Sequence, residues 1–200
     1  AFNSITRKNS ISDFGIKHII IRVGGGEFLY YRRISSDQIN KSFNIFGACY
    51  PELHPESKSV YDDIDFLKRK VDAGASHLLS QLFFDNKKFY RFLERCRIKG
   101  INVPIEAGIM PDTNKKSIER MVSLTNAVLP KKFTQMMERY ADRPEAIRDA
   151  GIAYAVDQIV DLVTHGVQGI HLYTMNNPYV AKKINDAVRS LFTVSPIEII

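Results

Sequence analysis

Cysteine is scarce in this 200-residue chain, and long apolar runs are missing from it. The two cysteines, Cys49 and Cys96, are too few for a disulfide framework and have no metal-ligand spacing, which favours a reducing compartment. No apolar run approaches the ~18–20 residues that span a bilayer, and the N-terminal segment lacks the apolar stretch of a secretory signal. These absences argue against secreted and membrane-spanning classes and predict a cytoplasmic protein.

The composition is typical of a folded globular domain. Hydrophobic residues make up 44% of the chain and charged residues 25%, and the length suits one domain over residues 1–200. The formal net charge of +6 favours an anionic partner, which could be nucleic acid, an acidic membrane or a small molecule with phosphate and carboxylate groups. Because the basic residues are dispersed, charge alone does not choose among these partners.

Apolar, β-branched runs alternate with helical patterns along the chain. The predicted strands cover residues 18–23, 43–50, 77–84, 103–109 and 169–174. Apolar stripes at helical spacing begin at Val60, Phe89, Ile118, Ile152 and Val180. The glycines expected at left-handed helix C-caps before strands are Gly74, Gly100 and Gly166.

This alternation predicts the α/β class, with a parallel sheet and helical crossovers. The candidates are a doubly wound sheet and a (β/α) barrel, and five strands can form only part of an eight-stranded barrel. Residues 24–42 interrupt the alternation of strand and helix patterns. The triplet Gly24 to Gly26 could cradle a phosphate through its backbone N–H groups, but it matches neither a dinucleotide fingerprint nor a P-loop, so a flexible loop is the alternative.

The loop of residues 50–58 follows one predicted strand and precedes a helix, where barrel enzymes place their active sites. Its two prolines stiffen the backbone, so Tyr50, Glu52, His54 and Glu56 would be held in place. The alternative is a rigid turn in which Glu56 favours the helix N-terminus. A metal site from this loop would need further ligands, and the chain has no second His or Cys cluster.

Four more polar residues are candidates for ligand contacts. Asp63 and Lys70 lie two turns apart on one helix flank, where they could bind ribose hydroxyls and a pyrophosphate or be ordinary surface charges. Gln81 lies in an apolar strand. Its amide could form hydrogen bonds with the edge of a heterocycle, or with partners inside the protein core. Tyr173 could offer a flat ring face at the mouth of a barrel.

Three stretches of the chain carry a family resemblance. They are YPELHPESKS followed by DDIDFLKRKVDAGA, then SQLFFDNKKFYRFLERCRIKGINVPIEAGIMP, and finally GIHLYTMNNP. In order and spacing they resemble methylenetetrahydrofolate reductase over about residues 43–192. The resemblance implies a (β/α)8 TIM-type barrel, present here in part as about five βα units that correspond to strands 4 to 8.

The resemblance also implies a chemistry. Flavin-dependent reductases of this family bind FAD and pass hydride from NADH or NADPH through the flavin to 5,10-methylenetetrahydrofolate, which gives 5-methyltetrahydrofolate for one-carbon metabolism and methionine biosynthesis. The implied partners are a folate and either a second copy of the chain or an electron-transfer protein, with neither nucleic acid nor membrane. By matching position, the residues that resemble FAD contacts are Tyr50, His54, Asp63 and Lys70, with Arg69 and Glu52 beside them. Gln81 resembles the folate contact, and Tyr173 lies in the substrate-binding motif.

Several positions depart from the family pattern. The family's general-acid glutamate lies on the first barrel strand, and no residue here matches it, so we assign no catalytic residue. Gly25 stands where the family has an aspartate, and residues 1–42 form a divergent or truncated region. Phe66 replaces a polar FAD-contacting residue, and Asn177 replaces an arginine.

The departures leave two other hypotheses. The chain could be a non-catalytic barrel remnant or interaction module that binds no flavin. It could also be an unrelated phosphate-binding aldolase or isomerase, which would need a reactive lysine that the sequence does not single out. Unpaired strand edges of an incomplete barrel would favour association.

Overall fold

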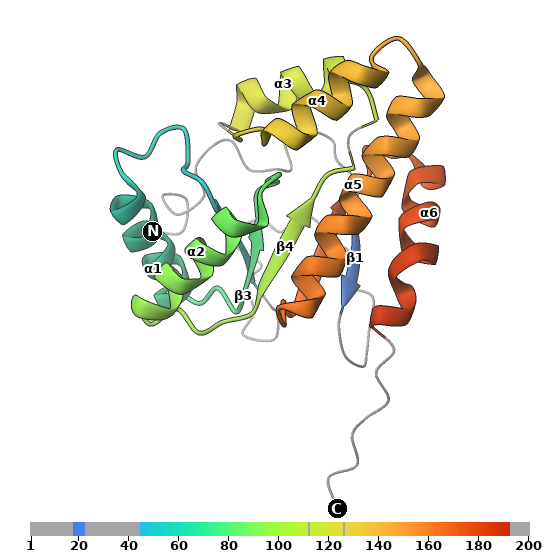
Figure 1. The fold of residues 1–200 in the computed structure, drawn as a ribbon. Coiled ribbons are helices and arrows are strands. Elements are labelled where there is room, and N and C mark those ends of the chain that lie inside the picture. The colour runs from blue at the N-terminus through green and yellow to red at the C-terminus, as the bar shows by residue number, and fades with distance from the viewer. Residues whose placement is uncertain (1–17, 23–44, 112, 126, 193–200) are drawn as a thin grey trace, which may run out of the picture.

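A computed structural model describes residues 18–22, 45–111, 113–125 and 127–192. Its centre is a sheet with the strand order β1-β5-β4-β3-β2 (Figure 1). The strands are β1 (His18–Arg22), β2 (Phe46–Cys49), β3 (His77–Ser80), β4 (Ile105–Ile109) and β5 (Gly169–Tyr173). Strands β2 to β5 run parallel to one another, which confirms the predicted βα series.

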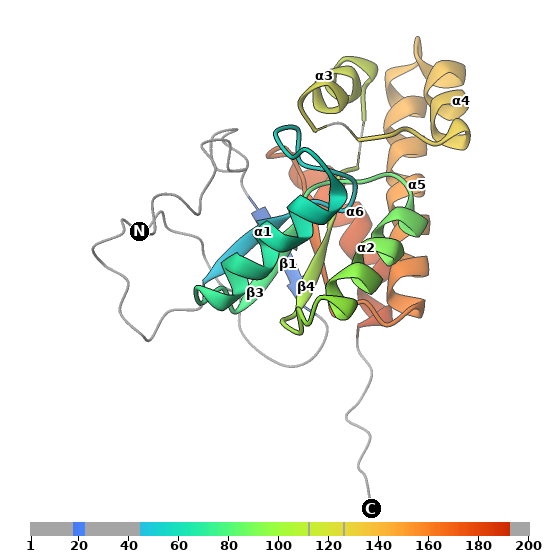
Figure 2. The ribbon, with the colours of Figure 1, turned by 90° about the vertical axis from the view of Figure 1, so that its left-hand side faces the viewer.

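Helices cover one face of the sheet and the carboxyl ends of its strands. The helices are α1 (Val60–Asp72), α2 (Asn86–Ile98), α3 (Lys115–Thr125), α4 (Lys131–Tyr140), α5 (Pro144–Thr164) and α6 (Pro178–Val188), with a 3-10 turn at Arg189–Leu191. Figure 2 shows α1, α2, α5 and α6 side by side along the sheet, with α3 and α4 above them. Within the described ranges, no helix is both long and apolar enough to cross a bilayer.

The five predicted helical stripes correspond to α1, α2, α3, α5 and α6. Three helices end as the glycine pattern predicts, because φ is +113° at Gly74, +75° at Gly100 and +77° at Gly166. Helix α4 is an additional element that none of the five stripes covers. The result is part of a (β/α) barrel with two extra helices between β4 and the next long helix, α5.

Strand β1 departs from the prediction of an all-parallel series. It runs antiparallel to β5, with His18 opposite Tyr173 and Arg22 opposite Gly169. The expected place of this strand was beside β2, as the fourth strand of a barrel. The edge of β5 offers unpaired N–H and C=O groups, which β1 satisfies here. In a closed eight-stranded barrel that edge pairs with a parallel strand.

The main core lies between the sheet and the helices α1, α2, α5 and α6. Because side chains alternate along a strand, every second residue of β3 to β5 faces these helices. The strand residues of this core are Cys49 of β2 and, from β3 to β5, Leu78, Ile105, Ala107, Ile109, Ile170 and Leu172. The fully buried helix residues that meet them include Phe89, Ile159, Leu162 and Ile184. Each large side chain buried in this way contributes roughly 1.5–3 kcal/mol.

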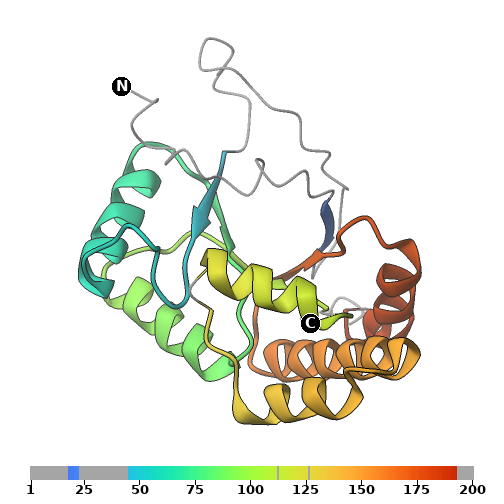
Figure 3. The same cartoon turned by 90° about the horizontal axis from the view of Figure 1, so that it is seen from above.

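A second apolar cluster holds α3 and α4 against the carboxyl ends of the strands. The sheet side supplies Leu82, Phe84, Met110 and Tyr173. The helices supply Ile118 and Met121 of α3 and Phe133 and Met137 of α4. Seen from above, α3 crosses the concave side of the sheet at this end (Figure 3). Helix α3 therefore covers part of the edge at which barrel enzymes place their active sites, while α4 packs along α5.

A polar network joins α2 to α5 outside the core. The Asp161 carboxylate accepts hydrogen bonds from Tyr90 Oη and Asn86 Nδ2, both at 2.7 Å. Burial by itself raises the pKa of Asp161, but the hydrogen bonds from Asn86 and Tyr90 outweigh it and lower this pKa below its ordinary value. Ionised Asp161 therefore stabilises the contact between the two helices.

Gly108 is predicted to tolerate no side chain. A Cβ at this position would lie 2.3 Å from Ser80 O and 2.7 Å from Tyr173 Cε2. Since the first of these atoms is backbone, Gly108→Ala should lower the free energy of unfolding by about 3 kcal/mol. Gly169→Ala is the matched control, because its Cβ would meet Glu106 Cγ, on a flexible side chain, at 3.0 Å. Urea denaturation showing equal losses for both variants would contradict this account.

Asp161→Asn should destabilise the fold by about 1 kcal/mol at pH 7, because two hydrogen bonds to a charged acceptor are weakened at a partly exposed site. Folding lowers this pKa, so the contribution is complete above the unfolded value of ~3.9 and is lost as the pH falls through the folded value. Asp157→Asn, which removes the exposed pair with Lys132, should have an effect near zero. Denaturation curves at pH 7 and near pH 3 measure both; a difference that persists undiminished at acid pH would refute the linkage.

Candidate functional site

Three loops begin close together at the carboxyl ends of the strands. Cys49 and Ser80 are register partners on β2 and β3, so the residues that follow them, Tyr50 and Gln81, emerge side by side. Gln81 N donates to Cys49 O at 2.7 Å. Tyr173, at the end of β5, donates from its hydroxyl to Ser80 O at 2.8 Å. The residues that begin these loops, Tyr50, Gln81 and Tyr173, therefore lie at one rim of the sheet.

Asp63 anchors the loop that carries Tyr50. From α1, its Oδ2 accepts a hydrogen bond from His54 N at 3.0 Å and its Oδ1 accepts one from Ser57 Oγ at 3.0 Å. Ser59, the N-cap of α1, accepts from Asp62 N and begins the helix at Val60. A carboxylate with both oxygens bonded to the loop is a structural element of this rim.

His54 is buried and fixed in one orientation. Only 3% of the residue is exposed, and its ring meets Tyr50 edge-on with the centroids 4.4 Å apart. Glu56 N donates to His54 Nδ1 at 3.1 Å. Because a backbone N–H can only donate, Nδ1 is the unprotonated nitrogen, and the neutral ring carries its proton on Nε2.

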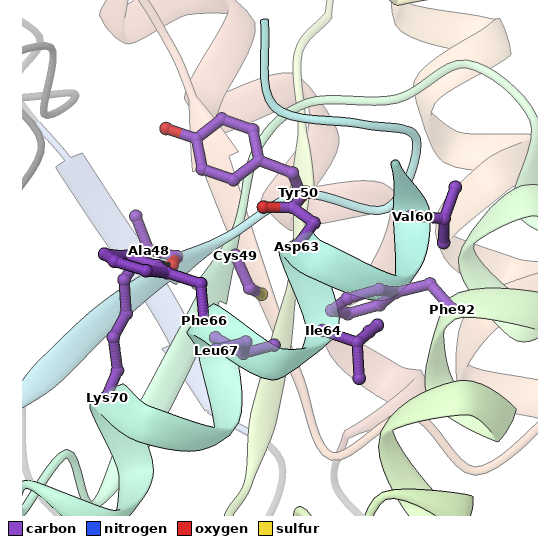
Figure 4. Close-up of a pocket in the computed structure, with 10 residues that line it drawn as sticks. All are labelled: Ala48, Cys49, Tyr50, Val60, Asp63, Ile64, Phe66, Leu67, Lys70 and Phe92. Atoms are coloured by element: carbon purple, nitrogen blue, oxygen red, sulfur yellow. Dashed lines mark hydrogen bonds between the residues drawn. The ribbon is translucent and has the colours of Figure 1, made fainter. Parts of the chain in front are cut away.

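Asp63 and Lys70 face a common small cavity between β2 and α1 (Figure 4). The cavity has a volume of about 10 Å³, which is room for a single water molecule. Its lining residues are Ala48, Cys49, Tyr50, Val60, Asp63, Ile64, Phe66, Leu67, Lys70 and Phe92. Three of the predicted cofactor contacts, Tyr50, Asp63 and Lys70, are thus brought together around it.

Two cations of α1, Arg69 and Lys70, both contact the Phe66 ring. Arg69 Cζ lies 5.1 Å and Lys70 Nζ 5.2 Å from the ring centroid, within cation–π range. Lys70 Nζ also donates to Ala48 O at 2.7 Å. A phosphate-bearing ligand would therefore have to compete with contacts inside the protein for the Lys70 ammonium.

Glu52 lies in the same loop but points to other elements. Its Oε2 accepts from Lys88 Nζ of α2 at 2.6 Å. Val128 N, between α3 and α4, donates to both carboxylate oxygens at 3.1 and 3.2 Å. The side chain is 10% exposed. Sequence reasoning did not find these partners, because they lie 36 and 76 residues away along the chain.

Gln81 and Tyr173 are both held by hydrogen bonds. Gln81 Oε1 accepts from Leu82 N at 2.9 Å, which orients the amide with Nε2 as its donor end. Tyr173 is only 1% exposed, beside His171 at 4.7 Å between centroids. Its ring therefore lies under the apolar cluster formed with α3 and α4, rather than open at the mouth.

The loop after β5 contains strain that the sequence did not reveal. Met175 and Asn176 have φ values of 49° and 62°, a region that side chains seldom adopt. Such strain gathers at functional sites when the surroundings maintain it. Asn177 Oδ1 then caps α6, accepting from Val180 N at 3.2 Å, and Pro178 is the first residue of the helix.

Metal and thiol chemistry find no support in the described part of the chain. None of its residues form a group of three or more potential metal ligands. Burial, with a contribution from Cys96, raises the pKa of Cys49 well above its usual value, and burial raises that of Cys96 to about 12. Both thiols are therefore protonated near neutral pH. The glycine triplet with Gly25 and the segment 1–42, apart from β1, lie outside the described residues.

The arrangement defines a class of protein before any comparison. Parallel βα units with polar side chains gathered at the carboxyl ends of the strands are the architecture of barrel enzymes. A family model for methylenetetrahydrofolate reductase matches residues 31–189. The chain belongs to the methylenetetrahydrofolate reductase family.

Individual relatives agree with this assignment. The 5,10-methylenetetrahydrofolate reductase of Escherichia coli (strain K12) is 37% identical over 172 residues, which cover 81% of this chain and 57% of that protein. The methylenetetrahydrofolate reductase (NADH) 1 of Arabidopsis thaliana is 38% identical over 143 residues, or 67% of this chain and 24% of that protein. The chain thus spans little more than half the length of its bacterial relative.

A solved structure shares the fold. It is described as an uncharacterized protein from Clostridium thermocellum that binds two copies of 5-methyl-5,6,7,8-tetrahydrofolic acid. The TM-score is 0.52 at 15% sequence identity, and the match covers 79% of this chain and 57% of that one. At this identity the likeness concerns the fold alone.

Replacement of Asp63 should loosen the loop at the rim. Asp63→Asn leaves one acceptor oxygen for two donors, so we expect the His54 amide to exchange its hydrogen about tenfold faster. Asp65→Asn on the same helix, which removes an exposed pair with Lys99, is the control. Amide exchange followed by NMR measures both, and an unchanged His54 rate in Asp63→Asn would contradict the anchoring role.

Proposed function

We propose that the protein to which this chain belongs reduces 5,10-methylenetetrahydrofolate to 5-methyltetrahydrofolate with FAD as cofactor. The observation that supports it most is that Tyr50, Gln81 and Tyr173 all lie at the carboxyl ends of strands of one sheet, β2, β3 and β5, with the Tyr173 hydroxyl bonded to Ser80 O across β4. Family membership supports it, since bacterial relatives are named 5,10-methylenetetrahydrofolate reductase.

The residues present fit FAD in their chemistry. Tyr50 and His54 supply aromatic faces, Asp63 a carboxylate acceptor for hydroxyls, and Lys70 and Arg69 cations for a pyrophosphate. A cavity of about 10 Å³ is too small to enclose any part of a flavin, so these residues would contact FAD from the rim. When bound, FAD supplies the hydride transfer, and NADH or NADPH would be the reductant.

The protein's own residues would bind and orient the reactants. Gln81, whose amide is oriented by Leu82 N, would address the edge of the pterin. Tyr173 would hold the rim through Ser80 rather than stack on the ligand, because its ring is buried. Glu52 lies beside the cofactor residues in sequence, but its contacts favour a positioning role.

We assign no residue of this chain as the proton donor of the reaction. The family's general acid has no match here, and iminium formation from the folate needs that proton whereas reduction of the flavin does not. We therefore propose that the chain by itself would be impaired mainly in the folate half of the reaction.

A second candidate function is a barrel module that binds no flavin. The small volume of the cavity and the contacts of Arg69 and Lys70 with Phe66 favour it, because these cations already have partners within the protein. We further propose a cytoplasmic location and a role in methionine biosynthesis. Association through the edge of β2, whose only partner among the described strands is β3, would make the protein a homo-oligomer.

Binding to Gln81 variants tests the leading proposal. The chain is reconstituted with FAD, monitored by flavin absorbance, and then titrated with 5-methyltetrahydrofolate. Gln81→Ala should weaken folate binding about tenfold through loss of hydrogen bonds and leave FAD binding unchanged. Gln168→Ala, an exposed glutamine just before β5 at the opposite end of the sheet, is the control.

Two outcomes would count against it. A chain that takes up no FAD at any concentration tested favours the flavin-free module. Equal folate affinity in Gln81→Ala and Gln168→Ala would remove Gln81 from the folate site.

A further inference from the structure

The Glu52 carboxylate joins three segments that are distant in the chain. It leaves the loop between β2 and α1, bonds Lys88 in the first turns of α2, and accepts from Val128 N between α3 and α4. At 10% exposure it is shielded from water more than an ordinary surface ion pair, so the contacts are correspondingly stronger. A charged acceptor shared by two donors fixes the linker in both distance and direction.

The hydrogen bonds at the linker set the direction in which α3 and α4 are held. Their largest other attachment is apolar, because Ile118, Met121, Phe133 and Met137 belong to the second apolar cluster. The Lys132–Asp157 pair between α4 and α5 is exposed and contributes little. Apolar packing is non-directional and sets how closely the helices approach the sheet. The Glu52 carboxylate sets the position of Val128 in the linker. Because α3 crosses the concave side at this end (Figure 3), the position of the linker determines how much of the rim is covered.

The contact of Glu52 with Lys88 and Val128 can break without leaving a buried donor unsatisfied. Val128 is 51% exposed and the Lys88 side chain 30% exposed, so water can solvate both donors once the carboxylate withdraws. The same loop carries Tyr50 and His54 two residues to either side of Glu52. Movement of the loop is therefore coupled to movement of the cover.

We infer that Glu52 is a positioning residue that fixes the α3–α4 linker, holds α3 over the rim as a latch and so slows the departure of a bound folate. The ligand part of this inference rests on the proposed function, whereas the latch itself does not. Glu52 would act through Val128 and Lys88 and touches no reacting atom.

The latch is tested in the whole chain by hydrogen exchange at the Val128 amide, assigned by NMR. Glu52→Ala should speed this exchange on the order of ten- to a hundredfold, as expected for loss of a hydrogen bond to a charged acceptor. Lys88→Met should have a smaller effect and Lys88→Arg almost none, since arginine retains the charge. Glu56→Ala, an exposed glutamate of the same loop, is the matched control. Unchanged exchange at the Phe92 amide, in the core, shows that each variant remains folded.

The folate part is tested by the dissociation rate of 5-methyltetrahydrofolate from the same variants. We expect this rate to rise in Glu52→Ala, less in Lys88→Met, and to stay at the wild-type value in Lys88→Arg and Glu56→Ala. An unaltered Val128 exchange in Glu52→Ala would overturn the latch. Faster exchange with an unaltered folate rate would overturn the positioning role. If the wild-type chain binds no folate, the proposed function fails, while Val128 exchange still decides the latch.

Discussion

Ser80 joins four strands at the carboxyl end of the sheet. Its hydroxyl accepts from Gly108 N at 2.8 Å and donates to Gln81 O at 3.0 Å, while its carbonyl accepts from the Tyr173 hydroxyl at 2.8 Å. The next N–H along the chain, of Gln81, donates to Cys49 O. Ser80 is fully buried, so each of these bonds would be costly to leave unmade. The positions of the ligand-binding candidates at the rim follow from this junction, and it forms only because Gly108 allows the strands to approach.

The rim combines the chemistry of a flavin and folate site with contacts that already occupy it. Tyr50, Asp63 and Lys70 surround one cavity, yet Lys70 is bonded to Ala48 O and stacked on Phe66. A cofactor would have to displace these contacts, so part of its binding energy would be used to rearrange the rim. The helices α3 and α4 add a second constraint, because they bury Tyr173 beneath the apolar cluster.

Local patterns predicted much of the fold and only part of the site. The strand and helix series could be read from periodicity, and Pro178 with Asn177 marks the start of α6, because both signals depend on neighbours in sequence. The direction and partner of β1 could not be predicted, since pairing depends on which sheet edge remains open. The hydrogen bonds of Glu52 likewise could not be predicted from the sequence, because their donors lie in other helices and linkers.

The sequence by itself determined the alternation of strand and helix, the family and the identity of the candidate residues, because these reside in local spacing and in motifs. Only the tertiary structure decided what those residues contact. Asp63 anchors a loop, Glu52 bridges to α2 and to the linker between α3 and α4, and Tyr173 is a buried support for Ser80. The physical reason is that a hydrogen-bonding group takes the partner that folding brings within about 3 Å, and that partner can be any distance away along the chain.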